Sequence, residues 1–171
     1  MELTKAIEIA EELRPGNQWQ SEVVERWLCE VDAEIQTEVC LKPINKIIPL
    51  IPPKWEYGQK HKAGDRVSIK DGTRHRAYLA RVDTMSEPNT TQEWMEVPIE
   101  TYVGTPHDKL YYLYLIAMMD YANEEYDKYS NDYAVYNAAV DEFAKWWQRN
   151  YRHTYSEDYD EYYTDRNPKA D

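Results

Sequence analysis

The first third of the chain carries two apolar stripes at helical spacing. Ala6, Ile9, Ala10 and Leu13 share one helical face, so the pattern predicts a helix over 4–13. The segment RPGN that follows ends it, because Pro and Gly interrupt helices. After Ser21, which we expect to be an N-cap, a second stripe predicts a helix that runs to the Pro-rich segment beginning at Lys42. Its members are Val24, Trp27, Leu28, Val31, Ile35 and Val39.

The middle of the chain changes from helical to strand-like patterning. The segment KPINKIIPLIPPKW holds four Pro within eleven residues and therefore predicts an extended linker. The runs DRVSI, AYLARV and EWMEV then alternate or are rich in β-branched residues, with Gly64, Gly72 and SEPNTT as turn signals. We interpret 53–97 as an inserted small β domain of three strands.

Helical spacing returns in the last third. Thr105 as N-cap and Pro106 at the first position predict a third helix over 106–129. The segment SND (130–132) offers a turn before a fourth helix that ends near Tyr151; without that turn the two would form one long helix. The stripes are Leu110, Leu113, Tyr114, Ala117, Met118 and Tyr121, then Tyr133, Tyr136, Val140, Phe143 and Trp147.

The predicted fold is therefore mainly α, a small bundle of about four helices with a β domain between the second and third. The helical domain comprises 1–52 and 98–152. Residues 153–171 have no apolar period and are acidic, so we expect a C-terminal tail that is mobile in the isolated protein.

Charge is unevenly distributed over these parts. The net charge is −12, yet 53–97 holds eight Lys/Arg and seven Asp/Glu. The net negative charge therefore lies entirely in the flanking segments. An acidic surface does not attract phosphates, which argues against direct nucleic-acid recognition and favours a basic partner. Sixteen Tyr against one Phe suit half-exposed surfaces such as subunit contacts, although a Tyr-rich core is the alternative.

Several functional classes lack support in the sequence. The acidic start MELTKAIEIAEEL is not a secretion signal, and no apolar run approaches the roughly 18 residues of a membrane span. Cys29 and Cys40 would lie about 16 Å apart along one helix, so we expect two free thiols and a reducing compartment. The four His have no metal-ligand spacing, and we find no nucleophile motif or phosphate loop. We expect no enzyme, no metal and no cofactor.

The helical part resembles the head–tail connector (adaptor) proteins of tailed bacteriophages. The resemblance rests on LYYLYL, DYANEEYDKYSND and YNAAVDEFAKWWQRN followed by a His, and on the opening pair TKAIEIAEELRP and SEVVERWLCEVDAEIQTEV. It implies a helical bundle that forms a ring, of twelve subunits, under the portal in the virion neck after assembly in the host cytoplasm. Such a ring contacts the portal and the next collar or tail-completion protein, and DNA passes through it without sequence-specific binding.

Two sets of tyrosines are candidates for these contacts. Subunit contacts would use Tyr112, Tyr126, Tyr129 and Tyr133. Portal docking would use the acidic tail, with Tyr155, Tyr159, Tyr162 and Tyr163.

The insert is similar to the small carbohydrate-binding modules of chitinases and cellulases. The matching order is Trp55, Tyr57-Gly58, Ala63-Gly64-Asp65, Val67, Gly72, Tyr78, Ala80, Pro88 and Trp94. His61 and Ile69 stand where that family has aromatic residues. The resemblance implies that Trp55, Tyr57 and Trp94 could stack on sugar rings, which would make the chain a carbohydrate-binding accessory protein. The alternative is that the three form the small core of the domain, leaving the insert as a contact surface.

Overall fold

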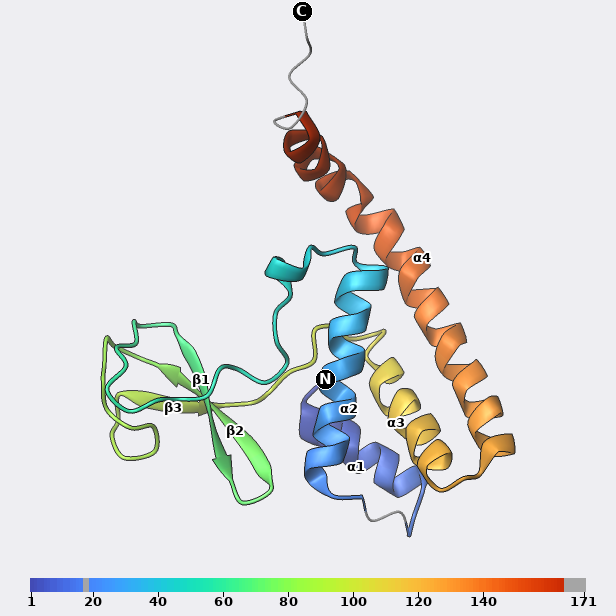
Figure 1. Ribbon diagram of the computed structural model, residues 1–171, viewed down its shortest axis with the longest axis horizontal. Coiled ribbons are helices and arrows are strands. Elements are labelled where there is room, and N and C mark those ends of the chain that lie inside the picture. The colour runs from blue at the N-terminus through green and yellow to red at the C-terminus, as the bar shows by residue number, and fades with distance from the viewer. Residues whose placement is uncertain (17–18, 165–171) are drawn as a thin grey trace, which may run out of the picture.

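The computed structural model describes residues 1–16 and 19–164, and side chains as far as residue 151. In this part of the chain, four α-helices surround a common core, and a three-stranded antiparallel sheet lies beside them (Figure 1). The predicted fold class, a small helical protein with a β insertion between the second and third helices, is confirmed. The elements are α1 (Leu3–Leu13), α2 (Ser21–Glu34), β1 (Arg66–Asp71), β2 (Arg74–Ala80), β3 (Trp94–Val97), α3 (Lys109–Ala122) and α4 (Tyr126–Thr164).

Several predicted helix boundaries are wrong. Ser21 is the first residue of α2, and Gln20 occupies the N-cap position without a side-chain hydrogen bond. α2 continues into one π-helical turn, Ile35–Val39, instead of a regular end. Helix α3 begins at Lys109, with Asp108 and not Thr105 at its N-cap.

Helices three and four are separate, but the break lies before the predicted SND turn. α3 ends at Ala122, and Glu124 adopts a left-handed φ of 61°. Its N–H and that of Glu125 then bond to the carbonyls of Tyr121 and Asp120, which closes the turn. α4 passes through 130–132 without interruption and continues to Thr164. The backbone of 153–164 is thus helical, where the sequence predicted that the fourth helix ends near Tyr151 and a mobile tail follows; 165–171 lie outside the described residues.

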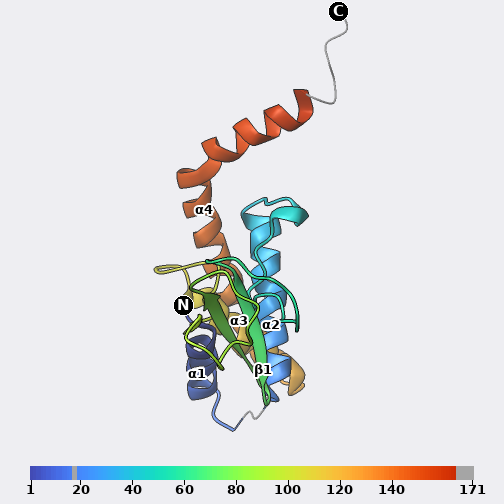
Figure 2. The same cartoon turned by 90° about the vertical axis from the view of Figure 1, so that its left-hand side faces the viewer.

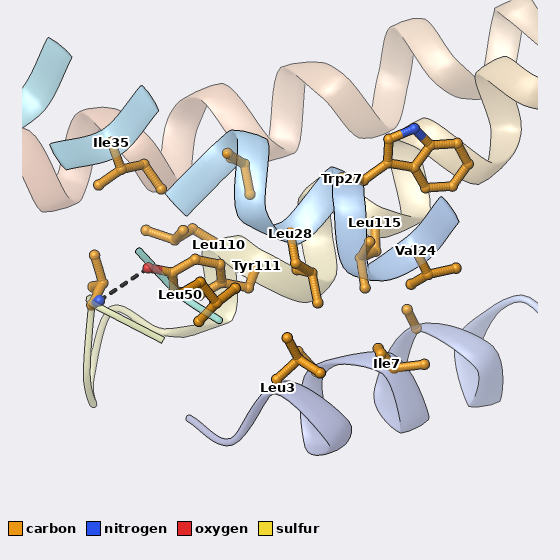
Figure 3. Packing of buried hydrophobic residues seen from close by; sticks show 14 of the residues in the cluster. Leu3, Ile7, Val24, Trp27, Leu28, Ile35, Leu50, Leu110, Tyr111 and Leu115 are labelled. Carbon is orange, nitrogen blue, oxygen red and sulfur yellow. Dashed lines mark hydrogen bonds between the residues drawn. The ribbon is translucent and has the colours of Figure 1, made fainter. Parts of the chain in front are cut away.

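Helix α3 is the centre of the core because apolar residues cover most of its circumference. Leu110, Leu115 and Met119 are fully buried, and α3 packs against α1, α2 and α4. Figure 3 shows Leu3 and Ile7 of α1 beneath the side chains of α2 and α3.

The two faces of the sheet have different roles. Cross-strand partners share a face, and the face of Val67, Tyr78 and Trp94 forms a small core of its own together with Ala80. The opposite face contains Ala77, which belongs to the main core, and Val97, which packs against it. The insert is therefore joined to the helices by one face of its sheet.

Two polar contacts hold the same face of the sheet to α2. Lys70 Nζ lies 2.8 Å from Glu22 Oε1. His75 Nδ1 lies 2.8 Å from Glu25 Oε2, and the Glu25 carboxylate is buried. Cross-strand pairing of Lys70 with His75 explains why both reach the same helix.

A buried carboxylate links α2, α3 and residues 98–108 between β3 and α3, which we call the second linker; the Pro-rich segment before the insert is the first. Asp32 Oδ1 accepts hydrogen bonds from the Tyr111 hydroxyl (2.6 Å) and the Tyr102 N–H (2.9 Å). Gln36 Nε2 donates to Asp32 Oδ2 and also to the Ile48 carbonyl, while the Ile48 N–H donates to Gln36 Oε1. Burial raises the pKa of Asp32, and these donors oppose the shift. The Tyr111 hydroxyl also accepts a hydrogen bond from the Val103 N–H. It therefore bonds both to the Asp32 carboxylate and to the backbone of the second linker.

Removing this hydroxyl tests the network. Tyr111→Phe leaves the Val103 N–H without its partner in a buried site and removes one of the two donors to Asp32 Oδ1, so we expect a loss of about 1–3 kcal/mol in unfolding free energy. Tyr112→Phe is the matched control, because no hydrogen bond of its hydroxyl is recorded among the described residues, and should change stability by less than about 0.5 kcal/mol. Urea unfolding followed by circular dichroism measures both; equal stabilities would contradict the assignment.

A second polar cluster joins the end of α1 to α3 and α4. Arg14 Nε lies 3.1 Å from Asp120 Oδ1, and Arg14 Nη2 binds both Asp120 and Asp132. Burial and a hydrogen bond with Asp120 raise the pKa of Asp132, whereas the guanidinium of Arg14 lowers it. Arg14 therefore holds two neighbouring carboxyl groups together across three helices.

The effect of Arg14 should appear as a pH dependence. Replacing it in Arg14→Met raises the pKa of Asp132 further. A carboxyl whose pKa is raised by folding contributes stability below its unfolded pKa, about 4, and this is lost as pH rises through the folded pKa. We expect the variant to lose more stability than the wild type between about pH 4 and pH 7, by about 1.4 kcal/mol per unit of additional pKa shift. Urea unfolding at several pH values measures the unfolding free energy of both proteins. If this free energy changes with pH equally in the wild type and in Arg14→Met, the expectation is refuted.

Candidate functional site

A continuous row of tyrosines runs along the antiparallel pair α3 and α4. It comprises Tyr114 and Tyr121 of α3 with Tyr126, Tyr129, Tyr133 and Tyr136 of α4, and we call it the tyrosine face. Neighbouring ring centroids lie 5.1–6.1 Å apart, from Tyr121–Tyr129 at 5.1 Å to Tyr121–Tyr126 at 6.1 Å. The α4 members follow a three-and-four-residue spacing, which places them on one side of the helix.

The tyrosine face is open at one end and buried at the other. Tyr126 and Tyr121 are 60% and 49% exposed, while Tyr136 is buried against the core. Rings that combine an apolar body with a polar tip and remain half-exposed are typical of protein interfaces. The exposed end therefore offers aromatic surface to a partner without disturbing the core.

Carboxylates of α2 adjoin the tyrosine face. Burial, then the charges of Glu34 and Glu30, raise the pKa of Tyr114 to about 12. Burial, Tyr129 and Glu34 raise the pKa of Tyr133. Both Glu side chains are exposed, and Glu30 Oε1 lies 3.7 Å from Arg26 Nε, so the face combines aromatic rings with solvent-accessible charge that is partly paired.

The structure brings together three of the four tyrosines predicted for subunit contacts. Tyr126, Tyr129 and Tyr133 lie on the tyrosine face, whereas Tyr112 has no recorded ring contact with it among the described residues. Sequence reasoning did not assign Tyr114, Tyr121 and Tyr136 to this surface. The three-and-four-residue spacing on α4 could have found Tyr136, but the α3 members depend on how the two helices pair.

A second aromatic cluster marks the point where α4 leaves the other helices. Trp147 and Tyr151 stack with centroids 4.2 Å apart, and Trp146 lies 5.2 Å from the buried His107. Tyr102 of the second linker packs against Trp147 at 6.2 Å. Beyond this cluster α4 projects away from the helical body (Figures 1 and 2). The candidate docking side chains Tyr155, Tyr159, Tyr162 and Tyr163 belong to this stretch and lie outside the described side chains.

The three aromatic residues proposed for sugar stacking do not form a common platform. Trp94 is buried in the small core, with its Nε1 donating to the Ser86 carbonyl. Trp55 is half-buried, and its ring plane lies at 84° to that of Tyr57, which is 93% exposed. Stacking on a pyranose ring needs an exposed aromatic face, which Tyr57 alone offers fully.

Chemistry-bearing groups are dispersed through the described part of the chain. No group of three His, Cys, Asp or Glu that could hold a metal ion occurs among those residues. Cys29 and Cys40 are free, and burial raises their thiol pKa values to about 11 and about 12, so neither is an activated nucleophile. None of the helices described here has the length and apolar character needed to cross a bilayer.

Comparison with known proteins does not identify this chain. No protein-family model, no curated protein and no solved structure matches it.

The different positions of Trp94 and Tyr57 lead to opposite expectations for their variants. Trp94→Ala should destabilise the β insert by about 3–5 kcal/mol, because it removes the largest side chain of the small core. Tyr57→Ala should leave stability within about 0.5 kcal/mol. Hydrogen exchange of the β1 and β2 amides measures the first effect, and a chitin pull-down with Tyr57→Ala tests the remaining sugar contact. Unchanged protection in Trp94→Ala would contradict a structural role for this side chain.

Proposed function

We propose that this chain is a structural protein of the neck of a tailed bacteriophage, where copies form the connector ring between the portal and the next collar protein. The main observation in support of the proposal is that the two halves of α4 have different surroundings. Its first half packs on α3 and bears the tyrosine face, and its second half projects beyond the helical body (Figure 1). One helix thus offers a lateral surface to neighbouring copies and a projecting arm to a different partner.

The electrostatics of the chain support a role around a DNA channel. The net charge of −12 disfavours binding of phosphates, so DNA would pass such a ring without being retained. The segment 152–164 contains Glu157, Asp158, Asp160 and Glu161 against one Arg, and its four tyrosines add aromatic surface. A basic surface of the portal is the partner that this composition suits.

The resemblance of the helical segments to connector proteins supports the same proposal. The segments that carry it, DYANEEYDKYSND and YNAAVDEFAKWWQRN, form the α3–α4 turn and the packed half of α4. They therefore coincide with the elements that bear the tyrosine face and the aromatic cluster around Trp147. A ring of twelve copies in the virion neck remains the arrangement that we propose.

Portal binding tests this function. The full chain should bind the portal protein of the same phage, and a chain ending at Arg152 should bind at least tenfold more weakly. A full-length variant with Tyr155, Tyr159, Tyr162 and Tyr163 changed to Ala should show the same loss, with Tyr57→Ala as the control that retains binding. Circular dichroism verifies that each variant keeps its helical body.

The possible outcomes separate two parts of the proposal. If truncation leaves portal affinity unchanged, the second half of α4 is not the portal arm. If the full chain binds neither the portal nor further copies of itself, the connector function is refuted.

A further inference from the structure

Most basic side chains of the β insert are exposed to solvent. Five of its eight basic side chains are exposed and have no recorded ion pair or side-chain hydrogen bond within the described residues. They are Lys54, Lys60, Lys62, Arg74 and Arg81. The net formal charge of the insert is +1, so these cations are offset by its carboxylates over the whole insert, and their effect depends on where they gather.

The carboxylates of the insert are largely engaged within it. Asp65 accepts from the Lys62 N–H at 2.8 Å, and Asp83 accepts from the Ala63 N–H at 2.9 Å. Arg76 binds both Asp71 and Glu96. Ser86 donates to Glu93 Oε2, as does Thr84. Of the seven acidic side chains, five are thus held in place by groups of the insert itself. Among the described residues of the insert, only Asp71 and Glu96 are paired with a cation there; Asp65 and Asp83 keep their charge and bind backbone beside Lys62.

Three of the free cations lie at the end of the sheet opposite the β1–β2 turn. Lys60 and Lys62 flank His61, which pairs with Thr84 through N–H to O distances of 2.8 and 2.9 Å. Arg81 follows the last residue of β2 directly. We call Lys60, Lys62 and Arg81 the basic tip.

Exposed apolar side chains adjoin the basic tip. Val82 and Met85 are 49% and 50% exposed and lie on either side of Thr84, the partner of His61. A surface that joins apolar side chains to cations suits a protein partner that offers aromatic rings and carboxylates.

The tyrosine face has this complementary chemistry. It presents half-exposed rings of Tyr121, Tyr126 and Tyr129 at one end. The exposed carboxylates of Glu30 and Glu34 adjoin it farther along, near Tyr114. Ammonium and guanidinium groups are attracted to the faces of aromatic rings, and opposite charges across an interface fix the orientation of the partners.

The basic tip and the tyrosine face lie on different sides of the molecule, so they cannot contact each other within one copy. The sheet lies on one side of α2 and α3, and α4, which carries four of the six tyrosines, lies on the other (Figures 1 and 2). Complementary surfaces on different sides of a subunit produce head-to-tail contacts, and such contacts close into rings when the rotation between copies permits.

We propose that the basic tip of one copy docks on the tyrosine face of the next copy. The insert then supplies the lateral contact of the ring, with Lys60 and Lys62 against the carboxylates of Glu30 and Glu34 and the tyrosine rings. This inference rests on the proposed connector function and assigns its subunit interface to named residues. It also gives the β insert a function that requires no sugar ligand.

A charge swap tests the contact in the full-length chain. Lys60→Glu/Lys62→Glu makes the tip acidic and should weaken self-association at least tenfold, in the free chain or on the portal of the same phage. The control Lys54→Glu/Arg74→Glu changes net charge equally within the same insert but away from the tip, and should assemble like the wild type. Sedimentation velocity and native mass spectrometry measure assembly, and circular dichroism verifies folding.

The second part of the experiment changes the tyrosine face instead of the basic tip. Glu30→Lys/Glu34→Lys makes the tyrosine face basic, so it should also fail to assemble alone. A mixture of this variant with Lys60→Glu/Lys62→Glu contains a complementary tip and face at every contact between unlike chains. The mixture should therefore assemble with strictly alternating copies, while each variant alone does not.

The outcomes distinguish this contact from the connector function. If the wild type and the tip variant assemble equally well, the contact between the basic tip and the tyrosine face is refuted, but the proposed connector ring is not. If both variants are impaired but their mixture does not recover, the pairing of tip with face is refuted. If the wild type neither assembles nor binds the portal, the function and the contact fail together.

Discussion

The helical body depends on the burial of one carboxylate. Asp32 sits in α2 with almost no exposure, and such a group costs several kcal/mol unless hydrogen bonds replace its water. The Tyr111 hydroxyl, the Tyr102 N–H and the Gln36 amide supply those bonds from α3, the second linker and the π-helical turn. Because the donors come from three segments, satisfying the carboxylate fixes the helical register of α3 against α2 and the path of both linkers.

Fixing α3 in this way determines which surfaces remain for partners. α3 is covered by α1 and α2 on two sides, so α4 can pack only along its remaining side, with the tyrosine face at that contact. Gln36 holds the backbone of Ile48 in the first linker, and the linkers deliver the sheet to the side of α2. Glu22 and Glu25 then hold the sheet there through Lys70 and His75. The tyrosine face and the basic tip therefore lie on different sides of the helical body (Figure 1).

The sequence predicted the elements better than the contacts between them. Helical spacing located the four helices found in the described residues, and alternation located the three strands there, because each element buries one face. The α3–α4 turn was misplaced because Asn123 and Glu124 are weaker turn signals than SND, while Asp132 within SND is held in the helix by Arg14, which is distant in sequence. Aromatic type alone could not distinguish Trp94, which is buried, from Tyr57, which is exposed. The tyrosine face was predicted only in part, since Tyr114 and Tyr121 join it through helix pairing.

Electron cryo-microscopy of the full-length chain assembled on its portal would show directly how the copies contact one another. We expect a closed ring in which the basic tip of each sheet contacts α3 and α4 of the neighbouring copy, with the second half of α4 directed at the portal. A map with the copies in a ring through their helices while every sheet is free of its neighbours would contradict the proposed contact. A map without any ring of this chain at the portal would contradict the function itself.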